Sequence, residues 1–178
     1  MEFKKRNVLI FVISGKAGTG KDAVANLLKD HYKNSIILSY AFYLKHYAKK
    51  ILGWDGNPDT KPREFLQNLG CELIKENISD SMLVDRMIED ILVYSYFYDV
   101  IIIDDARFPN EIDTIRNKFD NVYVIHMKGN KNILTDEQRK HISETSLDSY
   151  NNYDFEIEND YNMEDLTKTL EGIVNSIW

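Results

Sequence analysis

Residues 8–24 read VLIFVISGKAGTGKDAV and place an apolar run, a glycine-rich turn and the start of a helical pattern one after another. The run at 8–13 is typical of a strand that is buried on both faces of a parallel sheet. Beyond Lys21, residues recur three, four and seven positions apart, which predicts one buried face of a helix. This face comprises Val24, Leu27, Leu28 and His31. A strand, a turn and a helix in this order predict an α/β domain.

The glycine-rich turn has the spacing Gly-x-x-x-x-Gly-Lys from Gly15 to Lys21. Glycines let consecutive backbone N–H groups point into one cavity, and the following helix turns its positive end to the same place. Lys21 adds a charge that reaches β- and γ-phosphates. The pattern predicts a nucleoside triphosphate site, because the flanking strand and helix disfavour the alternative, a glycine-rich surface turn. The predicted ATP-binding residues are Gly15, Lys16, Ala17, Gly18, Thr19, Gly20, Lys21, Asp22 and Ala23.

Asp22 departs from the usual form of this loop, in which Ser or Thr places a hydroxyl on Mg²⁺. Ala23, the next residue, has no hydroxyl to offer. A carboxylate can take the place of the hydroxyl on or near the metal. Asp22 is therefore a predicted Mg²⁺ ligand.

Composition and charge describe a single globular domain over residues 1–178, with 43% hydrophobic and 29% charged residues. The formal charge of −7 disfavours stable binding to nucleic acid but leaves room for a local basic pocket. Cys71 is the only cysteine, which excludes an internal disulfide and favours a small apolar role for its side chain. The sequence is compatible with a homodimer as well as with a monomer.

The N-terminus carries Lys4, Lys5 and Arg6 before the apolar run, an arrangement that loosely resembles a secretory signal. The run continues directly into Gly15 and Lys16 without a small-residue cleavage site, so we interpret it as the first strand. No stretch approaches the roughly 20 apolar residues of a membrane helix. We therefore expect a cytoplasmic protein without a membrane partner.

Further apolar runs at 35–40, 100–103, 122–127 and 155–158 predict four more strands, separated by helical patterns. Helices are expected over 43–52, from Pro62 onward, after Ser79 or Asp80, and after a capping pair of Asn162 and Asp165. The alternation predicts a three-layer α/β fold with a five-stranded parallel sheet. The expected buried helix residues include Leu66, Leu69, Leu73, Val84, Met87, Ile88, Ile91 and Leu92.

Asp104 and Asp105 follow the strand at 100–103, and Arg107 comes two residues later. Ligands of open α/β sheets bind at the carboxyl ends of the strands, and an aspartate at this place can orient Mg²⁺. Asp105 is therefore the second predicted metal ligand. Alone, the pair could equally be a solvated strand end. An arginine beside a phosphate site is costly to bury without an anion, which favours a binding role for Arg107.

Residues 128–153 form a polar stretch with almost no apolar periodicity. An insertion of this length in a compact domain is usually functional or disordered. The stretch begins at Lys128 and carries the basic residues Lys131, Arg139, Lys140 and His141. We interpret the stretch as a lid over the site.

The chain resembles the deoxynucleoside monophosphate kinases of bacteriophages and their relatives, within the P-loop nucleoside monophosphate kinases. The resemblance covers nearly the whole chain, and its most specific parts are the Gly-Lys-Asp end of the loop and the stretch Arg-Phe-Pro-Asn-Glu. Ala23 departs from it, because the family commonly has Thr there. The matching residues are Gly15, Lys16, Gly20, Lys21, Asp22, Ser39, Tyr40, Ala41, Lys45, Arg63, Leu66, Gln67, Gly70, residues 105–111, His141, Ser143, Glu144 and Asn159.

The resemblance implies a P-loop NTPase fold with an acceptor-binding helical region at about 40–98 and a lid at about 128–153. It implies transfer of the γ-phosphoryl group from ATP, with Mg²⁺, to a nucleoside monophosphate. Lys16 and Lys21 would hold the donor phosphates, and Asp22 and Asp105 would hold Mg²⁺. The acceptor would meet Tyr40, Lys45, Arg63, Gln67 and Arg107, with Gln67 or Tyr40 reading the base. Lys21, Arg107 and the lid residue Arg139 are the predicted catalytic residues.

Four alternatives remain open at this point. Lys45 and Arg63 could be solvated charges on polar helix faces, and His141 could be a surface residue of the lid. A phosphomevalonate kinase of the animal type is similar to the same family and shares the Lys-Asp end of the loop. A nucleotide-binding switch that transfers nothing would need no second cluster of Lys45, Arg63 and Arg107.

Overall fold

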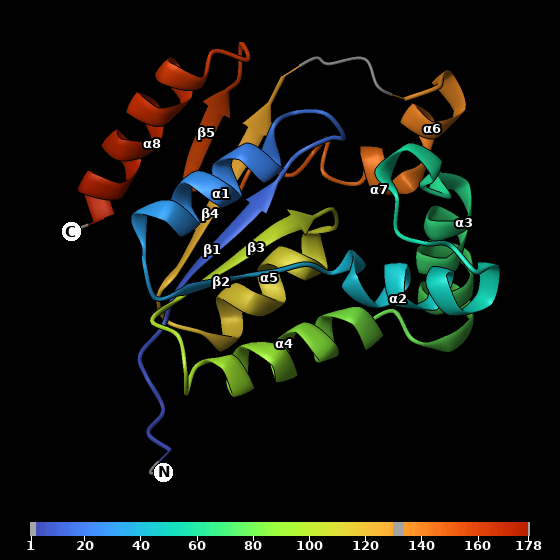
Figure 1. Cartoon of the computed structure of the whole chain (residues 1–178), viewed down its shortest axis with the longest axis horizontal. Coiled ribbons are helices and arrows are strands. Elements are labelled where there is room, and N and C mark those ends of the chain that lie inside the picture. Colours follow the sequence, from blue (N-terminus) through green and yellow to red (C-terminus); the bar gives the residue numbers. More distant parts are fainter. Residues whose placement is uncertain (1–2, 130–133, 178) are drawn as a thin grey trace.

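The computed structural model describes residues 3–129 and 134–177 (Figure 1). Five strands form one parallel sheet in the order β2-β3-β1-β4-β5. They span Leu9–Ser14 (β1), Ser35–Leu38 (β2), Val100–Ala106 (β3), Val122–Lys128 (β4) and Phe155–Glu158 (β5). The predicted parallel α/β sheet is therefore confirmed. The predicted lid residue Lys131 lies outside the described residues.

Helices cover both faces of the sheet and its carboxyl edge. The α-helices span Lys21–His31 (α1), Ala41–Leu52 (α2), Arg63–Asn68 (α3), Met82–Tyr94 (α4), Pro109–Lys118 (α5), Asp136–Lys140 (α6), Ile142–Thr145 (α7) and Met163–Ile177 (α8). A 3₁₀ turn, η1, spans Pro58–Thr60, and a π-helix, η2, spans Leu69–Ile78. Figure 1 shows α2, α3, α6 and α7 beyond the carboxyl ends of the strands. Within the described residues, no helix combines the length and apolar character needed to cross a membrane.

The central strand β1 separates two hydrophobic cores, because its successive side chains point to opposite faces. Ile10 and Val12 pack with residues of α4 and α5, whereas Phe11 and Ile13 pack with residues of α1 and α8. All four side chains are fully buried. Burial of each such side chain stabilises the fold by about 1.5–3 kcal/mol, which explains why this strand has no polar residue before Ser14.

The helical pattern after Pro62 differs from the prediction, because α3 continues into the π-helix η2. A π-helix turns more slowly per residue than an α-helix, so the buried positions shift along the sequence. Leu73, expected in the core, is 49% exposed, whereas Ile74 is 2% exposed. The prediction for Leu73 is therefore wrong.

Two smaller expectations about helix boundaries also change. Helix α4 begins at Met82 after Ser81, and not directly after Ser79 or Asp80. Leu92 in α4 is 36% exposed, so the buried face of that helix ends at Ile91. Before α8, Asn162 accepts a hydrogen bond from the Glu164 N–H at 3.0 Å and donates one to Asp165 at 2.7 Å.

Candidate active site

A cavity of about 570 Å³ opens at the carboxyl edge of the sheet. Its wall contains residues of the β1–α1 loop, the β2–α2 junction, α3, η2, the end of β3 and α7. The volume lies in the range of small-molecule sites. The cavity therefore brings together segments that are far apart in the sequence at the edge where open α/β sheets bind ligands.

The β1–α1 loop has the shape of a phosphate cradle. Gly15, Gly18 and Gly20 have φ values of 134°, 81° and 94°, a region that side chains with a Cβ rarely adopt. A Cβ on Gly20 would collide with the Asn159 side chain. Asn159 itself donates from Nδ2 to the Thr19 carbonyl at 2.9 Å, which braces the loop from the segment after β5.

Lys21 is 7% exposed at the start of α1, and its Nζ donates to the Lys16 carbonyl at 2.8 Å. Burial, followed by the charge of Arg107, lowers the pKa of Lys21 to about 7. The carboxylates of Glu144, Asp105 and Asp22 act in the opposite direction. A buried lysine whose pKa is lowered this far is typical of a functional site, here one that would bind an anion.

The predicted nucleotide-binding residues do not all face the cavity. Ala17, Gly18, Gly20, Lys21 and Asp22 line it. Four predicted residues are not part of its wall. Gly15 and Lys16 line a second, smaller cavity, where Lys16 forms an exposed ion pair with Asp148 at 2.7 Å. Thr19 donates to the Lys16 carbonyl, and Ala23 packs against the core.

Asp105 has a different position from the one expected of a metal ligand. Its carboxylate accepts hydrogen bonds from the Ser39 hydroxyl at 2.6 Å and from the Tyr40 and Ala41 N–H groups at 2.7 and 2.9 Å. Both oxygens are therefore engaged in fixing the start of α2. These hydrogen bonds favour a structural role for Asp105, and its assignment as a metal ligand stays a prediction.

Asp104, in contrast to Asp105, has a carboxylate oxygen that is not engaged in a hydrogen bond within the described part of the chain. Its Oδ1 is buried without a hydrogen-bond partner among the described residues. Burial raises the pKa of Asp104 to about 7, with further contributions from the charges of Asp105 and Asp22. A buried carboxylate oxygen beside a second carboxylate is an arrangement that a cation would stabilise.

Cationic side chains also gather along the cavity. Lys45, Arg63 and Arg107, all predicted from the sequence, line it together with Lys61. Burial, followed by the charges of Lys45, Arg63 and Arg107, lowers the pKa of Lys61. Lys61 was missed because it precedes Pro62 in a loop and has no periodic pattern to mark it.

The two predicted base-reading residues differ in their freedom to bind. Gln67 and Tyr40 both line the cavity. The Tyr40 side chain is 4% exposed, and its hydroxyl donates to the Glu111 carbonyl at 2.7 Å. The Tyr40 hydroxyl is thus already engaged, whereas Gln67 has no hydrogen bond recorded in the described structure.

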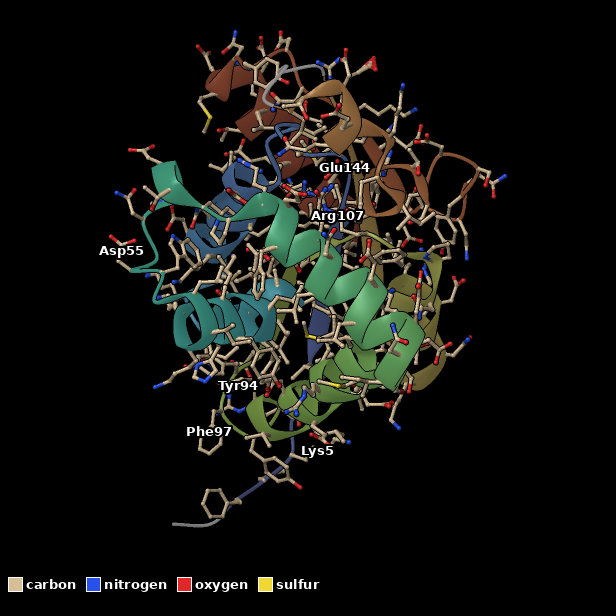
Figure 2. The ribbon with its side chains drawn as sticks, turned by 90° about the vertical axis from the view of Figure 1, so that its right-hand side faces the viewer. Lys5, Asp55, Tyr94, Phe97, Arg107 and Glu144 are labelled. Atoms are coloured by element: carbon tan, nitrogen blue, oxygen red, sulfur yellow. The ribbon has the colours of Figure 1, made fainter. Side chains whose placement is uncertain are left out.

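Arg107 is held in place from several sides. Its backbone N–H donates to Glu111 Oε2 at 2.7 Å, and its Nη1 lies 2.8 Å from Glu144 Oε2 (Figure 2).

Burial raises the pKa of Glu111 to about 7, although Lys75 lies 3.8 Å from it and acts in the opposite direction. Lys75 also lies 3.2 Å from the centroid of the Phe108 ring.

Arg139, the third predicted catalytic residue, is absent from the wall of the cavity. Its side chain is about half exposed and donates to the Leu134 carbonyl at 3.1 Å. A loose ion pair of 3.6 Å joins it to Asp136. The structure therefore does not bring Arg139 together with Lys21 and Arg107.

The parallel sheet, its strand order and the glycine-rich loop define a P-loop kinase fold. A profile of the family described as deoxynucleotide monophosphate kinase matches residues 45–170. The chain belongs to this family, and it is a phosphotransferase that phosphorylates nucleoside monophosphates with ATP.

Solved structures show the same fold at low sequence identity. Shikimate kinase from Aquifex aeolicus is 11% identical with a TM-score of 0.51, over 94% of this chain and 97% of that one. The Mycobacterium tuberculosis APS kinase CysC in complex with AMPPNP and APS is 12% identical with a TM-score of 0.53, over 96% and 99%. The tunicamycin resistance protein of Deinococcus radiodurans is 12% identical with a TM-score of 0.54, over 94% and 95%. A search of curated proteins finds no match.

Proposed function

We propose that the γ-phosphoryl group of ATP, bound at the β1–α1 loop, passes within this cavity to the phosphate of a deoxynucleoside monophosphate. The acceptor phosphate would bind to Lys45, Lys61, Arg63 and Arg107. The observation that carries the proposal is Lys61, whose pKa is lowered by burial and by these three neighbouring cations. Crowded, partly buried cations gain most from an anionic ligand, because the ligand removes their mutual repulsion.

The donor side of the proposal rests on the loop and on Lys21. Residues 15–23 would enclose the ATP phosphates, with the N–H groups of the loop and the N-terminus of α1 as donors. Lys21 would leave the Lys16 carbonyl and bind the phosphates, which supply the negative charge that favours its protonated form.

The residues present also fit Mg²⁺. We propose Asp22 and Asp104 as its carboxylate partners, because Asp104 Oδ1 is buried without a partner and the charge of Asp22 raises the pKa of Asp104. Among the described residues, no group of three His, Cys, Asp or Glu side chains could hold a metal. That agrees with Mg²⁺, which usually binds one or two carboxylates plus phosphates and water. When bound, Mg²⁺ neutralises phosphate charge and orients the donor.

Phosphoryl transfer requires no covalent intermediate with the protein. The side chains therefore act by positioning the reactants and stabilising charge. Lys21 would act on the donor oxygens, and Arg107, at the junction of the two sides, would act on the phosphoryl group in transit. The planar guanidinium can donate two parallel hydrogen bonds to a phosphate, which a lysine cannot.

The division of the chain follows from these roles. We propose residues 40–98 as the acceptor-binding region, residues 128–153 as a lid, and both as parts of one domain over 1–178. Arg139 would reach the cavity only after α6 moves toward it, excluding water from the reaction. The same proposal includes a cytoplasmic location, where ATP and nucleotides are available.

A coupled assay of ADP release with each of the four common deoxynucleoside monophosphates tests the function. We expect ADP release to depend on the acceptor, and Lys61→Ala to raise the acceptor KM about 10-fold or more. Lys168→Ala, which removes an exposed lysine of α8, is the matched control and should leave the rate unchanged. ADP release with mevalonate phosphate, or ADP release that no acceptor stimulates, would contradict the proposal.

A further inference from the structure

Glu144 is a carboxylate from the lid that lies between the donor loop and the acceptor cations. Its side chain is 6% exposed and belongs to the short helix α7. One oxygen, Oε2, accepts from the Ala17 N–H at 2.8 Å and lies 2.8 Å from Arg107 Nη1. Figure 2 shows the Arg107 and Glu144 side chains next to each other. A single oxygen atom therefore links the P-loop backbone, the lid and the proposed acceptor arginine.

The lid segment contacts Arg107 a second time through its backbone. The Ser146 hydroxyl donates to the Arg107 carbonyl at 2.5 Å, while the Arg107 N–H is held by Glu111 at 2.7 Å. Arg107 is thus held by hydrogen bonds at its N–H and carbonyl and by the ion pair with Glu144 at its guanidinium, where Nη1 makes no contact of hydrogen-bond geometry with the described residues. Two of these three contacts come from residues 144–146.

Burying the Glu144 carboxylate costs free energy unless a positive group pairs with it. A buried ion pair adds little net stability, but it fixes the relative positions of its two partners. The Glu144 carboxylate contacts one guanidinium and one loop N–H, and its charge also favours the protonated form of Lys21. These groups must be placed relative to each other for transfer.

We propose that Glu144 is a positioning residue for phosphoryl transfer: it sets the place of the Arg107 guanidinium relative to the P-loop when the lid segment is docked. The inference rests on the proposed function, because it assumes that Arg107 acts on the acceptor. In this role Glu144 acts through Arg107, although it also lines the cavity and accepts from the Ala17 N–H of the loop. The acceptor site then has its arginine in place only when residues 144–146 are docked.

A double-mutant cycle of Glu144→Gln and Arg107→Ala tests this directly. Gln keeps the shape of the side chain and an oxygen that accepts from the Ala17 N–H, but it removes the charge. We expect Glu144→Gln to lower kcat/KM for the best monophosphate acceptor about 10- to 100-fold, as small misplacements at a reacting centre do. The Kd for ATP alone should stay near that of the wild type. In the Arg107→Ala background, the same substitution should change kcat/KM less than about 2-fold.

The cycle has a second readout and a matched control. Where turnover of Arg107→Ala is too slow to measure, the acceptor Kd from calorimetry replaces kcat/KM. Glu164→Gln makes the same chemical change in an exposed ion pair of α8 and should leave every parameter unchanged. If Glu144→Gln does not fold, as judged by circular dichroism, Ser146→Ala removes the other lid contact and should show the same dependence on Arg107.

Two results would overturn the inference. Equal losses from Glu144→Gln in both backgrounds would mean that it does not act through Arg107. Tighter binding of ATP or acceptor with unchanged kcat would mean that Glu144 competes with phosphate for the site. In either case wild-type transfer to monophosphates would persist, whereas failure of the proposed function would appear as no transfer by the wild type.

Discussion

The Nζ of Lys21 donates to the carbonyl oxygen of Lys16 at 2.8 Å, so the loop satisfies the same ammonium group that we propose to bind ATP. Burial lowers the pKa of Lys21 to about 7, and the nearby charge of Arg107 adds to this. The neutral form of Lys21 therefore gains population in the free enzyme as the pH rises above 7, and bound phosphates would favour its charged form.

We expect ATP binding at pH 8 to take up a proton, and ATP affinity to fall as the pH rises above 7. Calorimetric titrations in buffers of different ionisation enthalpy measure the uptake. Lys21→Met should abolish most of it, because methionine has similar length and no proton to gain. Equal uptake by both proteins would contradict the assignment.

Asp104→Asn and Asp105→Asn should separate a metal-binding role from a structural one. We expect Asp104→Asn to raise the Mg²⁺ concentration needed for half-maximal rate about 10-fold or more, with little loss of stability, since Oδ1 of the carboxylate it replaces is buried without a hydrogen-bond partner among the residues described. Asp105→Asn should instead lower the free energy of unfolding by about 1–3 kcal/mol, because it weakens three hydrogen bonds at the start of α2. Rates at varied Mg²⁺ and urea denaturation measure the two effects, and the reverse pattern would return the metal role to Asp105.

Two glycines should respond in opposite directions to alanine. Gly20→Ala places a Cβ against Asn159 at a φ of 94°, so we expect a loss of at least about 2 kcal/mol and weaker ATP binding. Gly172 lies within α8, and a Cβ there meets nothing within 4 Å. Gly172→Ala should therefore stabilise the protein by about 0.5–1 kcal/mol. Thermal and urea unfolding of both variants, compared with the wild type, test the pair.

Arg139→Ala tests whether the lid moves. Arg139 lies outside the cavity and donates to the Leu134 carbonyl. If α6 closes over bound nucleotides, kcat should fall about 10-fold or more while the Kd for ATP changes little. Lys140→Ala, on the same helix, is the control. A loss of ATP affinity with unchanged kcat would argue against a role in turnover.

Much of the fold could be predicted from the sequence, because buried strands and amphipathic helices leave periodic patterns. The apolar run before Gly15 forms β1, as predicted. Gly53 ends α2, as its residue type predicted, and has a φ of 68°. The π-helix left no such mark. Its wider turns change which residues are buried, as the exchange between Leu73 and Ile74 shows, and a pattern search that assumes 3.6 residues per turn cannot detect this.

The site was predicted less completely than the fold. Lys45, Arg63, Gln67 and Arg107 line the cavity as the resemblance implied. The choice between Asp104 and Asp105 depends on which carboxylate the β2–α2 junction uses, which is a tertiary contact with no local signal. Lys61 is similar, since its importance comes from its distant neighbours in the sequence.

The π-helix η2 brings Gly70, Cys71 and Lys75 to the acceptor end of the cavity. The i→i+5 winding of this segment sets which of its side chains face the cavity and places Lys75 over the Phe108 ring. The shape of this part of the cavity is thus encoded in the winding and length of one helical segment as well as in the identity of its residues.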